Sequence, residues 1–355
     1  MFLAWNEMKN NKLRFALIIG VLTLVSYLVF FLSGLANGLE NLNKEAVDKW
    51  EAEGVILTDE SDINLPQSSF EQDEYDGNGA SESAVLGQFN SIATSGDNKA
   101  NVAIFGIKED EFIMPDVIEG ESFNKTGEVI ADDSLKDEGF EVGDELELSS
   151  IDETLTIVGF TEDAKFNAAP VLYGTMETYQ KVRYGEAAEA SEDLINAYVV
   201  RADNLDEITI DDSLQLISTQ SFIENMPGYT EQNLTLTLMI YFLFIVSAVI
   251  LAIFLYVLTI QKISIFGVMK AQGISNRYLS NSVIAQTFLL ALFGVIIGFG
   301  LTILTGFFLP AAVPVAFNYM DMALYAAILI VVSVLGALFS VQTIVKIDPL
   351  KAIGG

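Results

Sequence analysis

Residues Leu234–Ile260 read LTLTLMIYFLFIVSAVILAIFLYVLTI, a stretch that contains no Asp, Glu, Lys or Arg. Three other stretches share this property, namely Phe15–Leu35, Val283–Phe308 and Met322–Val345. About 20 residues of α-helix cross the hydrocarbon core of a bilayer, so each of these runs is long enough to span it. The sequence therefore predicts four transmembrane helices.

The first run has an alternative interpretation as a secretory signal peptide, because Lys9, Lys12 and Arg14 precede it. Its apolar length exceeds the roughly 7–15 residues of an ordinary signal core, and no clear small-residue cleavage site follows it. We interpret Phe15–Leu35 as an uncleaved first span.

Basic residues predict the orientation of the chain. Three short segments outside the runs hold 8 of the 18 basic residues but only two acids, Glu7 and Asp348. The eight basic residues are Lys9, Lys12, Arg14, Lys262, Lys270, Arg277, Lys346 and Lys351. Short loops rich in Lys and Arg stay on the cytoplasmic side. We therefore expect a multi-pass protein of the cell membrane with both termini cytoplasmic.

These patterns divide the chain into nine segments. They are a cytoplasmic amphipathic N-terminal helix 1–14, transmembrane helix 1 at 15–37, an extracellular α+β domain 38–233, transmembrane helix 2 at 234–260, a cytoplasmic coupling loop 261–281, transmembrane helix 3 at 282–309, an extracellular loop 310–321, transmembrane helix 4 at 322–345 and a cytoplasmic tail 346–355.

The predicted outer domain is strongly acidic. It holds 45 of the chain's 48 acidic residues and 10 of its 18 basic ones, which gives a formal charge of −35. Such a surface repels polyanions, so we expect no nucleic-acid partner. We interpret the acids as a solvating surface rather than a cation store, because the sequence has no D-x-D-x-D-G calcium loop.

The chain contains neither cysteine nor histidine. The outer domain must therefore rely on its core rather than on disulfides. The usual zinc sites, Ser-His-Asp and Cys-His catalysis and the commonest haem ligand are excluded. Chance pairs of carboxylates are expected at this density, so they do not indicate an enzyme. We expect no intrinsic cofactor and no resident metal.

Short β-rich runs separated by Gly and Asp turns follow Asn101: VAIFGI, EVIADD, DELELSS and ETLTIVGF, with NAYVV at Asn196–Val200. DSLKDEGF is predicted to form one or two helical turns that end at Gly139. Ser61–Ser95 is poor in apolar residues, and its composition predicts a mobile loop or linker. The predicted fold class is an α-helical membrane protein with four transmembrane helices plus a mixed α+β extracytoplasmic domain inserted between helices 1 and 2.

The second run leads into a basic segment without acids, IQKISIFGVMKAQGISNRYL, which ends at Leu279. Ile263, Phe266, Val268 and Met269 lie roughly on one face of a helix. One interpretation is an amphipathic segment that lies among the lipid headgroups. The other is a contact surface for a cytoplasmic partner, because this is the only sizeable cytoplasmic loop that the sequence predicts.

Three features together resemble the MacB/FtsX-type ABC transporter permeases: one outer domain between helices 1 and 2, the loop text GVMKAQGIS and the tail KIDPLKAIGG. That family carries G-[IL]-[LM]-K-A-x-G in the loop, from which Val268 is a mild departure, and x-P-x-x-A-[IL] at the tail. The outer text IEGESF to LTIVGF is also similar to the family's. Together with AWNEMKNNKLRF, these stretches most resemble the haem-exporter permeases of Gram-positive bacteria, the HrtB type.

The resemblance implies a transport subunit driven by a separate cytoplasmic ATPase, since the chain has no G-x-x-x-x-G-K-[ST] motif to cradle phosphates. It also implies a homodimer with two ATPase subunits that bind the ATP. The residues expected to couple to the ATPase are Ile263, Phe266, Gly267, Met269, Lys270 and Gly273. The start FLAWNEMKNNKLRF is expected to lie at the inner interface.

Haem is the cargo that the resemblance implies. The runs contain no ionisable residue, which argues against an ion or proton path and favours an amphiphile that enters from membrane lipid. Without His or Cys, haem iron is left with carboxylate, phenolate or thioether ligands. The candidates near the outer ends of helices 1 and 2 are Glu40, Glu45, Glu224, Met226, Tyr229, Glu231, Met239 and Tyr241.

Each candidate also has an ordinary structural interpretation. Glu40 and Glu45 suit a solvated acidic surface, Tyr229 and Tyr241 suit the aromatic belt of membrane helices, and Met239 suits a lipid-facing or core position. The function therefore has alternatives. One is an FtsX-like mechanotransmission subunit that regulates a cell-wall hydrolase, and the other is a MacB-like exporter of peptides or other amphiphiles.

Overall fold

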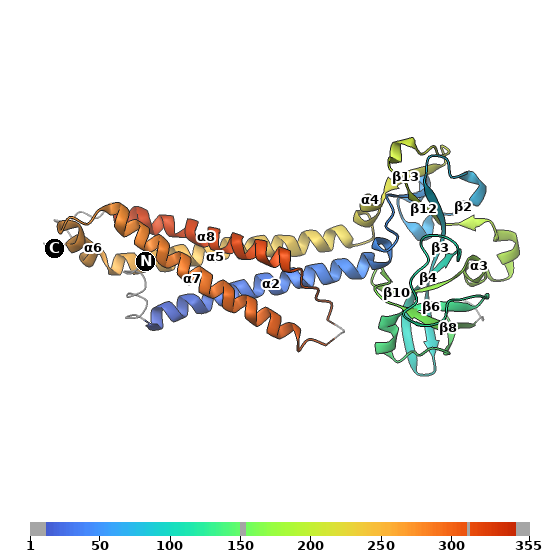
Figure 1. The fold of residues 1–355 in the computed structure, drawn as a ribbon, viewed down its shortest axis with the longest axis horizontal. Helices are drawn as coiled ribbons and strands as arrows, with labels where there is room; N and C mark the ends of the chain where they lie inside the picture. Colours follow the sequence, from blue (N-terminus) through green and yellow to red (C-terminus); the bar gives the residue numbers. More distant parts are fainter. Residues whose placement is uncertain (1–11, 150–153, 311–312, 346–355) are drawn as a thin grey trace. The chain divides into compact units, whose positions relative to one another are not determined.

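The computed structural model describes residues 12–149, 154–310 and 313–345. The chain divides into two compact units. The helical unit comprises the residues up to Gly38 and from Asn233 onward, and the inserted unit comprises Leu39–Gln232 (Figure 1).

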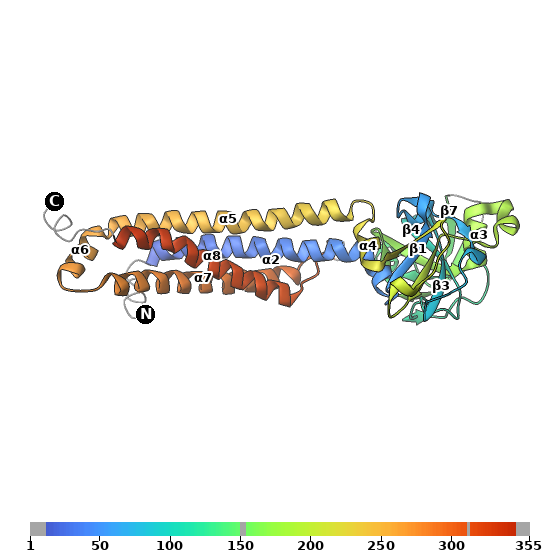
Figure 2. The ribbon, with the colours of Figure 1, turned by 90° about the horizontal axis from the view of Figure 1, so that it is seen from above.

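The helical unit is built from long helices that lie alongside one another in two views (Figures 1 and 2). The helices are α2 (Lys12–Asp48), α5 (Tyr229–Gln261), α6 (Ile263–Ala271), α7 (Asn276–Gly306) and α8 (Tyr319–Val345). Within the described residues, four of them are long and apolar enough to cross a membrane, and each coincides with one of the four runs predicted from the sequence, although α7 ends at Gly306, two residues before its run ends. Their shared core includes Val29 and Phe30 of α2, Phe244 of α5, Val295 of α7 and Leu329 of α8.

Helices α2 and α7 approach closely where Gly294 and Gly298 of α7 form a G-x-x-x-G motif. A Cβ atom at position 298 would lie 2.7 Å from Cβ of Ser26 and 3.0 Å from the backbone oxygen of Thr23. Small residues at such spacing let two membrane helices bring their backbones together, which favours their packing in lipid.

The inserted unit is a mixed sheet with short helices. Its strands are β1 (Gly54–Thr58), β2 (Phe70–Glu71), β3 (Glu82–Ser95), β4 (Asn98–Ile107), β5 (Glu119–Gly120), β6 (Glu128–Asp132), β7 (Glu145–Leu148), β8 (Thr154–Thr161), β9 (Lys165–Phe166), β10 (Ala169–Thr175), β11 (Leu194–Ile195), β12 (Ala197–Arg201) and β13 (Leu214–Ser218). Its α-helices are α3 (Met176–Tyr184) and α4 (Thr219–Glu224). Its 3-10 helices are η1 (Asp59–Ser61), η2 (Leu65–Gln67), η3 (Gln72–Glu74), η4 (Asp133–Glu138), η5 (Gly185–Ser191) and η6 (Leu205–Glu207).

The main sheet has the strand order β13-β1-β12-β3-β4-β10-β6-β8-β5. Strand β10 runs parallel to β4, and β6 runs parallel to β8, whereas the other pairs are antiparallel. Strand β7 pairs with both β3 and β8, which closes a ring of six strands around an apolar cluster that includes Ile104, Leu146, Ile157 and Leu172. The β-rich runs predicted from the sequence are confirmed as β4, β6, β7, β8 and β12, and DSLKDEGF as η4 before Gly139.

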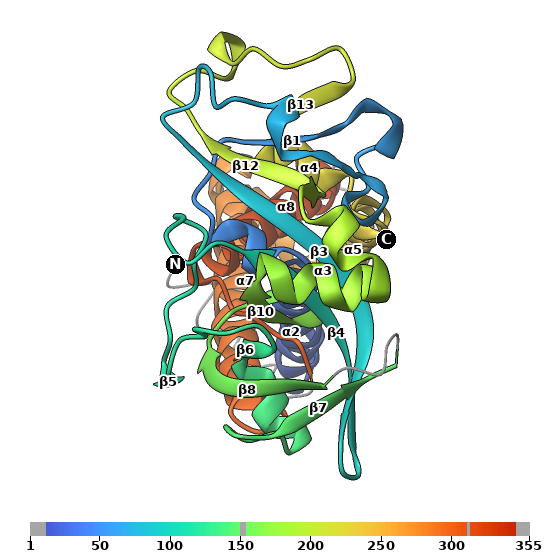
Figure 3. The same ribbon diagram turned by 90° about the vertical axis from the view of Figure 1, so that its right-hand side faces the viewer.

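Helix α3 lies across β3 and β4 (Figure 3) on three glycines that sit side by side on neighbouring strands. Gly87 of β3 pairs with Gly106 of β4, which pairs with Gly174 of β10. A Cβ atom at position 87 or 106 would collide with the side chain of Tyr179. The missing side chains therefore leave the space in which the fully buried Tyr179 of α3 packs.

The prediction of a mobile loop at Ser61–Ser95 is wrong for much of this segment. Strand β3 occupies the middle of the sheet between β12 and β4, with Ala84, Val85 and Leu86 buried, and Leu65 and Phe70 are buried as well. The composition is misleading because acids, Asn and the small residues Ser and Gly lower the apolar content of the segment. In β3 these small residues include Gly87, which the packing of α3 requires.

The G-x-x-x-G contact can be tested with two neighbouring glycines. We expect Gly298→Ala to destabilise the protein by about 1–3 kcal/mol, because its new methyl group must displace Ser26. Gly300 has nothing within 4 Å of a built Cβ, so Gly300→Ala is the matched control and should leave the melting temperature unchanged or slightly raised. Thermal unfolding in detergent measures both, and equal effects of the two substitutions would contradict the proposed contact.

Candidate functional site

The last turns of helix α2 belong to the core of the inserted unit. Ala46 and Val47 are fully buried there, and Trp50, which follows the helix, is 1% exposed. The indole of Trp50 lies 6.3 Å from the ring centroids of both Phe105 on β4 and Phe222 on α4. Trp50 therefore connects the end of α2 to the sheet and to the short helix that precedes α5.

A hairpin turn between β9 and β10 is hydrogen-bonded to the same part of α2. The backbone amide of Asn167 donates to the carbonyl of Asn43 at 3.0 Å, and that of Ala168 donates to the carbonyl of Leu42 at 2.9 Å. Both turn residues have positive φ angles, 49° and 63°, as expected for the two central residues of a type I′ hairpin turn. Asn tolerates this conformation better than Ala, so residue 168 is held there at some cost in strain.

The two acids predicted on α2 have different surroundings. Glu40 forms an ion pair with Lys44 at 3.0 Å, and Lys44 also contacts Asp48 at 3.5 Å. Glu45 accepts a hydrogen bond from the backbone amide of Lys165. Burial raises the pKa of the Glu45 carboxyl, an effect that Lys165 opposes and that Asp132 and Asp163 reinforce. Glu45 therefore faces the β9 region of the inserted unit, whereas Glu40 lies at a partly exposed position.

The candidates around α4 and the start of α5 also separate into two groups. Met226 and Tyr229 are only 4% and 6% exposed and belong to the same core cluster as Trp50. Glu224 is exposed at the end of α4, where its carboxylate accepts a hydrogen bond from Gln220 at 2.7 Å, and Glu231 is exposed in the first turn of α5. Met239, which is about half exposed, lies on α5 in the helical unit.

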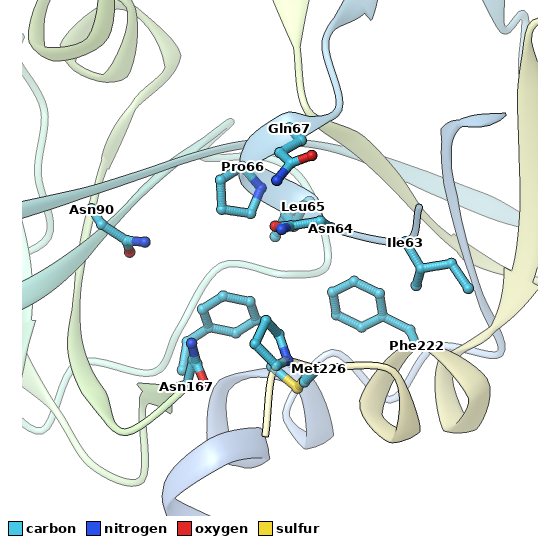
Figure 4. A pocket seen from close by; sticks show the side chains of 11 residues that line it. Ile63, Asn64, Leu65, Pro66, Gln67, Asn90, Asn167, Phe222 and Met226 are labelled. Carbon is cyan, nitrogen blue, oxygen red and sulfur yellow. The ribbon is translucent and has the colours of Figure 1, made fainter. Parts of the chain in front are cut away.

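The inserted unit contains a cavity of about 250 Å³ that the sequence analysis did not identify (Figure 4). Its lining residues are Ile63, Asn64, Leu65, Pro66, Gln67, Asn90, Phe166, Asn167, Phe222, Met226 and Pro227. They come from the segment around η2, from β3, from the β9–β10 hairpin, and from α4 and the residues that follow it. No local spacing in the sequence links these four segments, so only the fold reveals the cavity.

The predicted coupling loop contains helix α6 and the start of α7. Phe266 and Gly267 are buried, and Phe266 packs with Leu279 and Val283 of α7. On α6, the exposed large apolar side chains are Ile265, at 56%, and Val268, at 43%. Ile265 is not among the residues predicted from the sequence, and Phe266 and Val268 are predicted on one face, although only Val268 is exposed.

The remaining coupling candidates hold the loop in place. The side chain of Lys270 donates to the backbone carbonyl of Val345 at the end of α8, at 3.2 Å. Gly273 has a φ angle of 89°, which allows the turn between α6 and α7. Ile263 and Met269 are half-buried. The predicted amphipathic helix 1–14, apart from Lys12–Arg14, and the tail 346–355 lie outside the described residues.

Two family models match the chain. The MacB-like periplasmic core domain matches residues 15–214, and the FtsX-like permease C-terminal domain matches residues 237–349. In solved structures, the chain is similar to the extracellular domain of the noncanonic ABC-type transporter YknZ from Gram-positive bacteria, at 12% identity and a TM-score of 0.35, over 47% of this chain and 99% of that one. It is also similar to the periplasmic region of MacB from Actinobacillus actinomycetemcomitans, at 13% identity and a TM-score of 0.32, over 50% and 94% of the two chains.

Proteins of similar length match over the whole chain. Two are named "Putative hemin transport system permease protein HrtB", from Staphylococcus haemolyticus and Staphylococcus epidermidis; each is 26% identical over 100% of this chain and 99% of its own. An uncharacterized ABC transporter permease of Mycobacterium bovis is 24% identical over the same shares.

The four apolar helices and the inserted mixed sheet, together with the two family models, define a multi-pass membrane permease. The chain belongs to the MacB/FtsX family of ABC transporter permeases, since the MacB-like model alone matches more than half of it. The predicted family and fold class are thus confirmed, including the position of the extracytoplasmic domain between the first two membrane helices. A permease of this kind works with a cytoplasmic ATPase, so the exposed apolar face of α6 is the candidate contact for that partner.

Substitutions on α6 should separate partner contact from folding. We expect Ile265→Asp to weaken copurification of the ATPase subunit at least about tenfold, because it places a charge on the exposed apolar face, and to leave the melting temperature unchanged. Phe266→Ala should instead lower the stability by about 3–5 kcal/mol, because it empties a buried site. Normal recovery of the ATPase with Ile265→Asp would rule out this face as the contact.

Proposed function

We propose that the chain is the permease subunit of an ABC exporter that extracts haem from the membrane and releases it outside the cell, driven by a separate cytoplasmic ATPase. The observation that carries this proposal is the full-length similarity to the two staphylococcal proteins named as hemin transport permeases. Such an exporter would protect the cell from haem that accumulates in its membrane.

The chemistry of the chain supports haem as cargo. Haem is an amphiphile that partitions into lipid, and the four apolar runs carry no ionisable residue that would indicate a path for a small ion. With no His or Cys, ferric iron is left with oxygen ligands or thioethers. Glu40, Glu224 and Glu231 are candidate carboxylates that are partly or fully exposed. Glu224 ends α4 and Glu231 lies in the first turn of α5, whereas Glu40 lies about two turns before the end of α2.

Tyr229 and Met226 enter the proposal in a different way. Both are buried with Trp50 and Phe222 in this conformation, so neither is available to haem unless the segment from α4 to α5 shifts. We propose that they take part only if ATP-driven movement opens this segment. Glu45 is half-buried against the β9 region and is a weaker ligand candidate than Glu40 for the same reason.

The distribution of charge supports an orientation with both termini and α6 in the cytoplasm. The basic residues Lys262 and Arg277 flank α6 and Lys270 lies in its last turn, whereas the inserted unit is strongly acidic. Since basic loops stay inside, ATP binding and hydrolysis by the partner would act on α6, and the inserted unit would respond outside. Two ATPase subunits and two copies of this chain are the proposed assembly.

Helix α5 offers a surface for the second copy. Leu238, Phe242, Ile245, Val249 and Ile253 follow one face of the helix, and each is between 46% and 64% exposed. We propose that this stripe faces the second copy of the chain, and that membrane lipid covers the other exposed apolar side chains.

A second candidate function is mechanotransmission without transport. In this function the outer domain transmits conformational changes, driven by the ATPase, to a cell-wall hydrolase. It is supported by the FtsX-like match over residues 237–349 and by α2, which contributes residues to both units. Export of a peptide or another amphiphile by the same mechanics would follow from the MacB-like match.

Hemin titration tests the proposed cargo. We expect the purified full-length chain in detergent to give a saturable Soret shift, and Glu40→Gln or Glu231→Gln to weaken hemin binding by about tenfold, because a carboxylate ligand is lost. Glu138→Gln, an exposed acid on η4, is the matched control. Tyr229→Phe keeps the buried ring and shows whether the phenolate contributes. Absence of a saturable shift would favour the mechanical or peptide-export function.

Cysteine cross-linking tests the proposed dimer, because the natural chain has no cysteine. We expect Ile245→Cys and Val249→Cys to form disulfide-linked dimers in oxidised membranes. Leu335→Cys on α8, which is 54% exposed, is the control and should remain monomeric. The α5 interface is wrong if the α8 variant cross-links and the α5 variants do not.

A further inference from the structure

We propose that the cavity in the inserted unit binds a small neutral molecule that combines an aromatic ring with amide or hydroxyl groups (Figure 4). At about 250 Å³ it is smaller than the pockets of roughly 300–1,000 Å³ that hold drug-sized ligands. A ligand about the size of one aromatic amino-acid amide matches this space. The proposal does not depend on haem as cargo.

The floor of the cavity suits a flat apolar group. The rings of Phe166 and Phe222 are stacked, with centroids 6.5 Å apart and an interplanar angle of 18°. Leu65 and Met226 are buried beside them. Aromatic pairs favour offset-stacked or edge-to-face arrangements, and a thioether makes favourable contacts with ring edges, so an aromatic ligand gains more from this floor than an aliphatic one of equal size.

The rim of the cavity is made of side-chain amides. Asn64 is half-buried, and Gln67, Asn90 and Asn167 are exposed. The oxygen of Asn90 accepts a hydrogen bond from Gln88 at 2.7 Å, which leaves its nitrogen as a donor for a ligand. An apolar floor with a few convergent polar groups is the usual anatomy of a ligand site.

The charge of the lining favours a neutral ligand. None of the eleven lining residues is charged, although residues 38–233 carry 45 acids and 10 bases. An anion would find no cationic side chain at the rim and would be repelled by the acidic surface, and a cation would find no carboxylate in the cavity.

Backbone strain also occurs at the cavity. Ile63, which lines the cavity, has a φ angle of 61°, which is exceptional for a β-branched residue. Strained backbone of this kind costs about 1–3 kcal/mol per residue and clusters at ligand clamps, so it supports a binding role here.

The location of the cavity gives the ligand a mechanical consequence. Phe166 and Asn167 belong to the hairpin whose turn amides hydrogen-bond to α2, and Phe222 and Met226 belong to the segment that leads into α5. A ligand that contacts both walls would tie the hairpin to this segment within the inserted unit. We infer that ligand binding at this site restrains the end of α2 and the start of α5.

The test uses the full-length chain in detergent with Trp5→Phe, which leaves Trp50 as the single tryptophan. Trp50 lies directly behind the cavity wall, against Phe222. The probe is N-acetyl-phenylalaninamide, which is neutral and carries one ring and two amide groups. We expect a saturable change in Trp50 fluorescence with a dissociation constant on the order of 1 mM for a ligand of this size. Bound probe should also slow hydrogen exchange of the Asn167 and Ala168 amides.

Two controls define the site. Asn64→Asp and Asn90→Asp add a charge and remove a donor at the rim, so each should weaken binding at least about tenfold. Asn124→Asp, in an exposed loop away from the cavity, should leave binding unchanged. The anion N-acetyl-phenylalanine should bind at least about tenfold more weakly than the amide. Equal binding of anion and amide, insensitivity to both rim substitutions, or no response in either fluorescence or hydrogen exchange would overturn the proposal.

Discussion

The burial of Trp50 at the end of helix α2 is the contact on which the arrangement of the inserted unit depends. Its indole packs against Phe105 of the sheet and Phe222 of α4, and the turn amides of Asn167 and Ala168 bond to α2 just before it. A helix long enough for a membrane therefore ends as part of a soluble core. Glu45 and the hairpin wall of the cavity lie against this part of α2.

Much of the architecture could be predicted from the sequence because membrane helices obey a simple constraint. A run such as Val283–Phe308 without charges has no plausible alternative structure, and the basic residues around α6 are equally clear. Strands β4 and β8 were predictable because their short β-rich runs, VAIFGI and ETLTIVGF, are bounded by turn residues. These signals are local, so a single sequence is sufficient to detect them.

The failures share a physical cause, which is that the decisive partner is distant in the sequence. Strand β3 resembled a linker because its small residues make room for Tyr179, which lies about 90 positions later. Met226 and Tyr229 are predicted as ligand candidates near the outer end of the second membrane helix, yet both pack against the core around Trp50. The cavity depends on four separate segments, and the inward direction of Phe266 depends on α7.

The row of glycines beneath α3 has a consequence for how this domain changes over evolutionary time. Gly87, Gly106 and residue 179 share one volume, so the three positions cannot vary independently. A relative with a side chain at position 106 must carry a smaller residue at 179 or hold its helix farther from the sheet. Among homologous outer domains, the size of the side chain at position 87 or 106 should therefore be inversely correlated with the size of the side chain at position 179.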